Sequence, residues 1–354
     1  MPPSETRIRI TRRGRALIYA IYLSVLVLLF VAAAEAIVRS KGYGPWQRVD
    51  ISIQVDPGGK FFRPHPTLGY SHIPGRFRVT LGSGYAFDVT HGPDTLRITH
   101  PLDGIDGPKQ QREVWIFGCS FTHGWSLNDQ ETYPWLLQER FPEYEVVNFG
   151  VSGYGTIHSL LQFRSALEGK APAIAVLAYA GLHDERNTFL RTRRKDIAPW
   201  NKLGPLVQPY ARLNEEGGLQ YSFASPEYSE FPFMRYSALA HFLEISYNQL
   251  EARWYRSHAV SEALIKEMAE LAKKHGVTFV VANIYASRED LYYTWLGRDM
   301  LEFAEENGIP NVDMSVDLSL PQNRNLPHDM HPSANANQQY ADKLEAFLRP
   351  ALPK

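Results

Sequence analysis

The sequence predicts an α/β protein: a three-layer α/β/α fold around a five-stranded, mostly parallel sheet, preceded by one transmembrane helix and a small β-rich segment. Two patterns predict it. From residue 113 onward, short apolar runs alternate with longer amphipathic stretches, which is typical of parallel strands covered by helices. Near the N-terminus, residues 16–34 form an uncharged run of the length that spans a bilayer.

The N-terminal segment combines a basic head with this apolar run. Residues 1–15 carry five arginines and one glutamate. Nineteen helical residues rise roughly 28 Å, close to the hydrocarbon thickness of a bilayer. We therefore expect a cytoplasmic tail over residues 1–15, a transmembrane signal anchor over residues 16–38 and export of the remainder. A cleaved signal peptide is the alternative, since Ala32, Ala33 and Ala34 suit a peptidase, but the apolar run is longer than a usual signal peptide core.

The composition excludes several classes of protein. The 354 residues, 44% of them apolar, suffice for one large domain or two small ones. Without the first 15 residues, 32 basic and 37 acidic residues remain, a net charge of -5, which argues against a nucleic-acid partner. Cys119 is the only cysteine, so an intrachain disulfide and a zinc site built from cysteines are both excluded.

Residues 39–112 are rich in Gly, Pro and β-forming residues, which predicts a β-rich lead-in packed on the main domain. Its expected strands lie at residues 61–62, 77–80, 85–89 and 96–98. The main domain is expected over residues 113–354. Its strands, apolar on both faces, are expected at residues 114–117, 146–149, 174–179, 277–284 and 311–314.

Two helices of the main domain have clear signals. Ser261 is a candidate N-cap for a helix with apolar residues at Leu264, Met268, Leu271 and Ala272, and Gly276 would end it. The last helix carries one apolar stripe, and Pro350 follows it. That stripe consists of Tyr340, Leu344, Phe347 and Leu348.

An insertion at residues 185–256 interrupts the alternation. A loop of this length is uncommon in a compact domain unless it is functional or has structure of its own, and residues 236–254 look helical. We expect the insertion to cover the site. Its basic run, residues 191–195, is interpreted as a solvated face in preference to a surface for an anionic polymer.

Catalytic chemistry is indicated by four loops that follow predicted strands. The stretch 118–124 (Gly-Cys-Ser-Phe-Thr-His-Gly) places Ser120 directly after a strand, although a serine there could also simply cap a helix. Residues 148–155 and 179–184 follow the next two strands, and His331 precedes the last helix. In open α/β sheets the ligand crevice lies outside the carboxyl ends of the strands, so these loops should converge. A serine is activated by a neighbouring base, for which His331 is the candidate.

These blocks, in this order, resemble the SGNH (GDSL-type) hydrolase superfamily over residues 114–348, and the anchor with its lead-in resembles bacterial membrane-anchored members. The resemblance implies a flavodoxin-like fold, location at the bacterial inner (cytoplasmic) membrane with the catalytic domain on the periplasmic side, and no cofactor or metal. It implies Ser120 as nucleophile, His331 as general base and Asp329 as the acid that orients it. The oxyanion hole would combine the N–H groups of Ser120 and Gly153 with a third donor from His183.

Three positions depart from the family pattern. Cys119 stands where the family has Asp; a cysteine nucleophile there is the disfavoured alternative, because its side chain should point away from the crevice. His183 replaces an asparagine, and a histidine merely packed in a loop is an equal alternative. The family's acid usually lies three residues before the histidine, where this chain has His328; His328 and His123 are interpreted as rim and loop residues.

The expected function is that of a membrane-anchored extracytoplasmic serine esterase, which hydrolyses ester-linked acyl groups, most simply O-acetyl groups on a carbohydrate. An O-acetyltransferase that uses the same three residues is the first alternative. A non-catalytic polysaccharide-binding or assembly component is the second, motivated by Cys119 and His183. The sequence predicts neither protein partners nor an oligomeric state.

Overall fold

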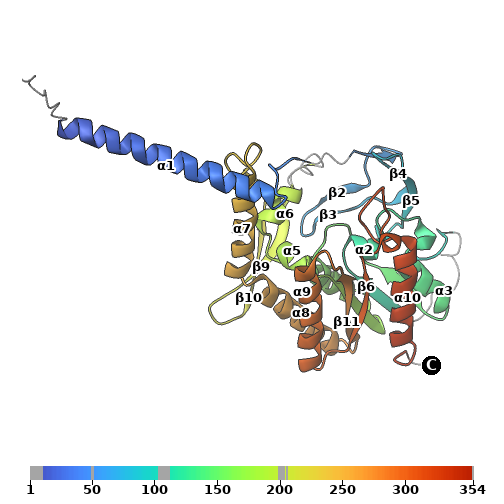
Figure 1. Cartoon of the computed structure of the whole chain (residues 1–354). Coiled ribbons are helices and arrows are strands. Elements are labelled where there is room, and N and C mark those ends of the chain that lie inside the picture. Colours follow the sequence, from blue (N-terminus) through green and yellow to red (C-terminus); the bar gives the residue numbers. More distant parts are fainter. Residues whose placement is uncertain (1–10, 49–51, 103–111, 198–203, 205, 353–354) are drawn as a thin grey trace, which may run out of the picture. The chain divides into compact units, whose positions relative to one another are not determined.

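The computed structural model describes residues 11–48, 52–102, 112–197, 204 and 206–352 (Figure 1). Its internal contacts divide the chain into two compact units. The first combines Met1–Val49 with Ser229–Gln249, and the second combines Asp50–Tyr228 with Leu250–Lys354. Each unit is described by itself.

The first unit contains the long apolar helix α1 (Arg12–Ser40). An 18-residue window of α1 has a mean hydropathy of 2.6, so the helix is long and apolar enough to cross a membrane. Near its end, the Glu35 carboxylate accepts hydrogen bonds from the backbone N–H groups of Ala238 and Leu239, at the start of α7 (Ala238–Trp254). A carboxylate at this position satisfies N–H groups that have no partner within the helix. The predicted helix at residues 236–254 is therefore confirmed.

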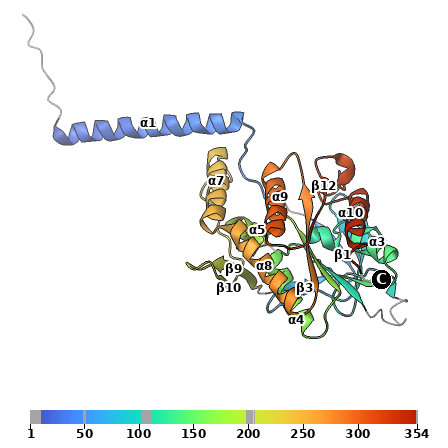
Figure 2. The ribbon, with the colours of Figure 1, turned by 90° about the horizontal axis from the view of Figure 1, so that it is seen from below.

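The second unit is built around a parallel sheet (Figure 2). Its five strands follow the order β12-β11-β8-β6-β7, and every neighbouring pair is parallel. All five predicted strands are confirmed, each within a few residues of its predicted ends. They are β6 (Glu113–Phe117), β7 (Glu145–Asn148), β8 (Ile174–Tyr179), β11 (Thr278–Ala286) and β12 (Asn311–Asp317).

Helices cover both faces of this sheet. Because successive strand side chains point to opposite faces, Val114 and Ile116 pack in one core while Trp115 and Phe117 pack in the other. The first core is closed by α3 (Tyr133–Arg140) and α10 (Ala334–Leu348), and the second by α4 (Thr156–Leu167), α8 (Ser257–Lys274) and α9 (Leu291–Glu306). The three-layer α/β/α prediction is confirmed.

The start of α8 corrects one prediction. The helix begins at Ser257, after Arg256 in a left-handed conformation, so Ser261 lies in its second turn and is not its N-cap. The buried Ser261 hydroxyl instead lies in a polar cluster and donates to Asp184 Oδ1 at 2.5 Å. The end of α8 is as predicted: the helix ends at Lys274, and Gly276 adopts a φ of 69°.

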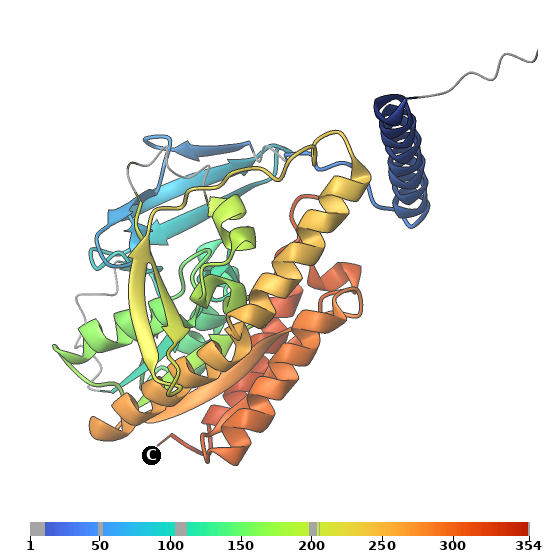
Figure 3. The same ribbon diagram turned by 90° about the vertical axis from the view of Figure 1, so that its left-hand side faces the viewer.

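The lead-in forms an antiparallel sheet in the order β1-β4-β5, beside a β2–β3 hairpin (Figure 3). Its strands are β1 (Ile53–Asp56), β2 (Phe62–His65), β3 (Gly69–His72), β4 (Gly75–Leu81) and β5 (Ala86–His91). The predicted strand at residues 96–98 is wrong. Only Arg97 pairs there, through single antiparallel bridges to His91 and to Asn148 at the end of β7, because the chain turns at Thr95 with a φ of 72°. This bridge joins the lead-in to the edge of the parallel sheet.

The part of the insertion that lies in the second unit contains α5 (His183–Asn187), α6 (Arg191–Ile197) and a β9–β10 hairpin (Gln208–Leu213 and Leu219–Ala224). Its basic run is not a solvated face throughout. Arg193 is 8% exposed and donates to the carbonyl of Gly153 at 2.7 Å and to the Tyr70 hydroxyl at 3.3 Å. At this position the interpretation as a solvated face was wrong, because the guanidinium anchors the loop that contains Gly153. Short helices complete the second unit: α2 (Ser120–His123), η2 (Asp129–Glu131) and η4 (Pro321–Asn323).

Candidate active site

The turn after β6 places Ser120 at the first position of α2. A Cβ atom at Gly118 would lie 2.2 Å from Thr122 Oγ1, so only glycine permits this close turn. Gly124 ends α2 with a φ of 79°. The first N–H groups of a helix have no partner within the helix, so the backbone N–H of Ser120 is available to an acceptor outside α2.

Ser120, His331 and Asp329 form one continuous line of hydrogen-bond contacts. Ser120 Oγ lies 3.0 Å from His331 Nε2, and His331 Nδ1 lies 2.5 Å from Asp329 Oδ1. The same carboxylate oxygen accepts the backbone N–H of His331 at 2.8 Å. Because a carboxylate is an acceptor, it favours the imidazole tautomer with the proton on Nδ1, which leaves the Nε2 lone pair to accept the Ser120 hydroxyl proton.

Asp329 is held as an anion by several donors. Its side chain is 13% exposed, and burial opposes ionisation. Two N–H groups of His331, one in the ring and one in the backbone, donate to this carboxylate, and the ring also attracts it electrostatically. Together with the indole N–H of Trp125, they outweigh burial and lower the pKa of Asp329 below its usual value. Trp125 donates to Asp329 Oδ2 at 2.7 Å. The site therefore contains a fixed negative charge behind the imidazole.

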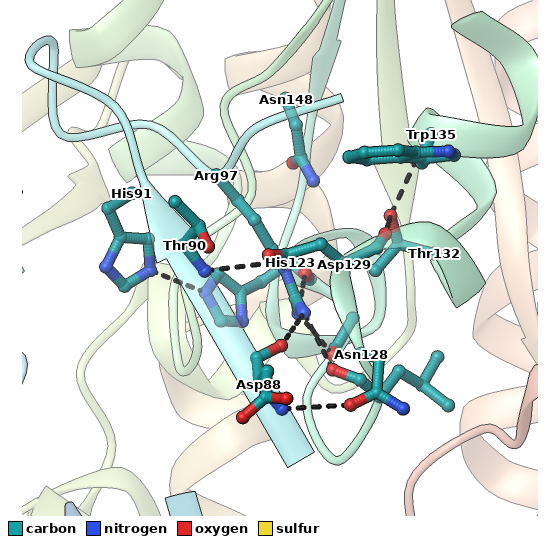
Figure 4. A network of polar contacts seen from close by, with 12 residues as sticks. Asp88, Thr90, His91, Arg97, His123, Asn128, Asp129, Thr132, Trp135 and Asn148 are labelled. Carbon is teal, nitrogen blue, oxygen red and sulfur yellow. Dashed lines mark hydrogen bonds and ion pairs between the residues drawn. The ribbon is translucent and has the colours of Figure 1, made fainter. Parts of the chain in front are cut away.

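A buried arginine supports the turn that carries Ser120 (Figure 4). Arg97 has a fully buried side chain, and its Nε lies 3.0 Å from Asp129 Oδ1. Its remaining donors reach the carbonyls of His123 at 2.8 Å, Gly124 at 2.5 Å and Leu127 at 2.7 Å. Thus a lead-in residue satisfies the carbonyl groups at the end of α2. Sequence reasoning missed this role; an arginine within a β-forming stretch was the available signal.

Gly153 lies in the loop after β7, where it adopts a φ of 84°. A Cβ atom there would lie 2.5 Å from the Tyr70 hydroxyl and 2.8 Å from Arg193 Nη2, so the packing of this loop requires glycine. Asn148 connects this loop to α2, because its side chain donates to the Thr122 carbonyl at 3.0 Å and accepts from the Gly150 N–H at 2.9 Å. The Gly153 loop and α2 are therefore held together.

Of the other predicted positions, Cys119 and His183 lie in the interior and His328 lies at the surface. Cys119 is 1% exposed and belongs to the apolar core, so its thiol is directed away from the crevice. His183 is fully buried, both of its ring nitrogens lack a hydrogen-bond partner among the described residues, and its ring packs edge-on against Tyr179. An oxyanion donor must be accessible to substrate, and His183 is not. His328 lies at the surface, stacked on Tyr85.

His331 borders a pocket of about 220 Å³. Its lining is largely apolar and comprises Phe121, Tyr285, Leu318, Arg324, Met330 and His331. The His331 side chain is 31% exposed, so the imidazole is open to solvent as well as to the pocket. A serine hydroxyl, an imidazole and a small apolar pocket therefore lie at one place.

No protein-family model matches the sequence, and neither does any curated protein. Solved structures do match it. TesA aligns over 68% of this chain and 100% of its own, with 13% identity and a TM-score of 0.43. A GDSL-like lipase from Bacteroides thetaiotaomicron aligns over 71% of this chain and 94% of its own, with 16% identity and a TM-score of 0.40. A variant of Axe2, an acetyl xylan esterase from Geobacillus stearothermophilus, aligns over 68% of this chain and 95% of its own, with 14% identity and a TM-score of 0.40.

Proposed function

We propose that this chain is a serine esterase of the SGNH (GDSL-type) superfamily, which hydrolyses ester-linked acyl groups, most simply O-acetyl groups on a carbohydrate. The observation that carries the proposal is the line of contacts from Ser120 Oγ through His331 to Asp329. A serine hydroxyl, an imidazole with a free Nε2 and a carboxylate on Nδ1 are the groups that acyl transfer through a covalent intermediate needs.

In the first step, His331 Nε2 takes the hydroxyl proton while Ser120 Oγ attacks the ester carbonyl. The imidazolium is stabilised by Asp329, and it then donates the proton to the departing alcohol oxygen. This leaves the acyl group on Ser120. A water molecule, deprotonated by the same imidazole, attacks the acyl-serine, and collapse of the tetrahedral species returns the proton to Ser120 and releases the carboxylic acid.

The N–H groups of Ser120 and Gly153 are the proposed donors to the oxyanion. Each donor aimed at the developing charge contributes roughly 2.7–4 kcal/mol to transition-state stabilisation. The buried position of His183 leaves the third donor unassigned.

Two features favour a small acyl group and water as its acceptor. The apolar pocket beside His331 is below the volume of about 300–1,000 Å³ that is usual for drug-sized ligands. Exposure of the imidazole gives water access to the acyl-serine. An O-acetyltransferase would use the same three residues but would need to exclude water from this intermediate.

The proposed setting is the extracytoplasmic face of a bacterial membrane, with α1 as the anchor. The length and apolar character of α1 support an anchor or a signal sequence. The mass of the protein extracted from membranes tests which one applies: an anchor retains residues 1–38, whereas peptidase cleavage at residues 32–34 removes the segment before that site.

The activity is tested with the full chain in detergent micelles and an activated acetyl ester. We expect hydrolysis by the wild type and by Cys119→Ala, and none by Ser120→Ala. A serine-directed phosphonate should label the wild type and Cys119→Ala only. Equal turnover by Ser120→Ala would exclude the proposed nucleophile. With an acetylated polysaccharide, free acetate supports the esterase, and acetyl transfer to an added sugar acceptor supports the transferase.

A further inference from the structure

Three buried histidines from separate elements meet beside α2. His72 ends β3, His91 ends β5 and His123 ends α2, and they are 1%, 2% and 0% exposed. One ring nitrogen of each lies within 4.8 Å of one ring nitrogen of each of the others. His91 Nε2 and His123 Nε2 are 3.1 Å apart, a contact that Figure 4 shows. The His72 and His91 rings stack with their centroids 3.9 Å apart.

Backbone carbonyls decide which nitrogens of this cluster carry lone pairs. His72 Nδ1 lies 3.2 Å from the Thr95 carbonyl, and His91 Nδ1 lies 3.2 Å from the Ile73 carbonyl. A carbonyl only accepts, so both Nδ1 atoms are the protonated ones and both Nε2 atoms are lone-pair donors. His72 Nε2 has no hydrogen-bond partner among the described residues, although it is buried.

Burial disfavours a positive charge on all three rings. Burial lowers the pKa of His72 to about 3, and it lowers the pKa values of His91 and His123 well below their usual range. Arg97 acts in the same direction on all three. A buried lone pair without a partner costs free energy, so a ligand bound at His72 Nε2 would stabilise the folded protein.

We propose that His72, His91 and His123 form a binding site for a transition-metal ion of the Zn²⁺ class. Neutral imidazoles suit such ions, and three of them leave the fourth tetrahedral position for water. For His72 and His91, the bonds from Nδ1 to carbonyl groups are the outer contacts that metal-ligating histidines usually make, because they fix the tautomer and the ring orientation.

The distances require only a limited closure. Zn–N bonds of about 2.0–2.1 Å place tetrahedral ligand nitrogens roughly 3.4 Å apart. His91 Nε2 holds a lone pair, so its 3.1 Å contact with His123 Nε2 is a hydrogen bond that His123 donates. The His123 proton must therefore move to Nδ1 before its Nε2 can bind the ion. The ligand nitrogens of the three rings lie within 4.8 Å of one another. The stacked rings of His72 and His91 must therefore splay so that their Nε2 atoms converge. Phe61 and Phe62 pack against the cluster. The ring centroids of Phe61 and His91 are 5.6 Å apart, and those of Phe62 and His72 are 5.1 Å apart. These two rings would keep the bound ion from bulk water.

An ion at this site would join two strands of the lead-in to the helix that begins with Ser120. The site is separate from the proposed esterase chemistry, in which none of these histidines takes part. Arg97 opposes a second positive charge nearby, but its own charge is paired with Asp129. Metal binding can thus be measured whether or not the chain hydrolyses esters.

The test uses the full chain in detergent, stripped with a chelator and titrated with Co²⁺, whose tetrahedral complexes absorb visible light. We expect one Co²⁺ per chain with tetrahedral absorption, its displacement by Zn²⁺, and a higher thermal unfolding midpoint with Zn²⁺. His72→Ala and His72→Gln should weaken Co²⁺ binding at least roughly 10- to 100-fold. Loss of a residue that merely hydrogen-bonds a ligand already lowers metal affinity by that factor, and His72 is itself a proposed ligand. His72→Gln keeps an amide donor for the Thr95 carbonyl and so guards against simple misfolding.

His275→Ala, a surface change at the end of α8, is the matched control and should bind Co²⁺ as the wild type does. The chain holds one competing cluster among its described residues, formed by His258, Glu262 and Asp299. Binding that is lost in His258→Ala but kept in both His72 variants would overturn the proposal. So would the absence of stoichiometric tetrahedral Co²⁺ in the folded wild type.

Discussion

The indole N–H of Trp125 donates a hydrogen bond of 2.7 Å to Oδ2 of Asp329, the carboxylate that faces His331 with its other oxygen. The backbone N–H of Trp125 donates to the Ser120 carbonyl at 3.0 Å. The turn that presents the proposed nucleophile therefore also holds the proposed acid. Loop residues far apart in the sequence are fixed to one another by this tryptophan.

Replacing Trp125 with Phe should slow ester hydrolysis without unfolding the protein, because the ring remains while its donor is lost. A hydrogen bond to a charged group contributes about 1.5–3 kcal/mol, so kcat/KM should fall about tenfold or more. Trp135→Phe is the control, since the Trp135 indole N–H donates to Glu139 at the surface. Equal rates for the two variants would remove Trp125 from the proposed mechanism.

Asp329→Asn should lower kcat by about 10³-fold or more, because an amide neither stabilises the imidazolium nor favours the required tautomer. His328→Ala, at the position where the family's acid usually lies, should change the rate by less than about twofold. Steady-state kinetics on the same acetyl ester measure both. A large loss in His328→Ala with a small one in Asp329→Asn would reverse the assignment.

The lowered pKa of Asp329 predicts a pH-dependent contribution to stability. Its carboxylate is ionised in the folded protein at pH values where the unfolded chain binds a proton. The contribution is therefore fully present above the unfolded pKa of about 3.9 and is lost as pH falls through the lower folded value. The difference in unfolding free energy between wild type and Asp329→Asn should be constant near neutral pH and shrink below about pH 4. Urea unfolding at a series of pH values measures it; a difference independent of pH would contradict the assignment.

Arg97→Met should strongly destabilise the second unit, because it leaves the Asp129 carboxylate without its ion-pair partner and several buried carbonyl groups without their donor. Removing one partner of a buried ion pair costs about 3–5 kcal/mol. Arg78→Met breaks an exposed pair with Asp88 and should cost about 1 kcal/mol or less. Denaturant unfolding of the two variants gives the comparison. Similar losses would mean that the buried contacts of Arg97 add little.

Met330→Ala should shift acyl preference toward longer chains, since Met330 lines the pocket beside His331 yet is itself 59% exposed. Each methylene accommodated contributes about 1–3 kcal/mol to discrimination. The ratio of kcat/KM for butyryl over acetyl esters should therefore rise. An unchanged ratio would place the acyl group elsewhere.

Much of the fold could be predicted because its signals are local. The strands of the parallel sheet are buried on both faces, so each is a short apolar run that the sequence displays directly. The end of α8 was predictable for the same reason, since Gly276 adopts the left-handed conformation that glycine favours. The N-cap prediction at Ser261 was wrong because a serine before an apolar stripe resembles an N-cap, whereas its hydroxyl donates a hydrogen bond to Asp184 inside the second unit.

What the sequence could not predict depends on long-range contacts. Arg97 looked like part of a strand and Arg193 like part of a charged surface, yet both are buried among carbonyl groups of distant loops. Their roles depend on which loops approach, and residue type does not show this. The spacing of Asp329 and His331 suggested a pair, but the contribution of Trp125 arises only when the C-terminal loop lies against the turn after β6.

Ser120 and His331 are 211 residues apart, and the loop that supplies both the base and the acid leads directly into α10. During synthesis the proposed nucleophile therefore emerges long before the groups that would activate it. A chain released early, even one with most of its sheet complete, would contain an inert serine. Under the proposed function, reactivity would begin only as α10 docks, so this order of assembly would keep unfinished molecules from acting on esters.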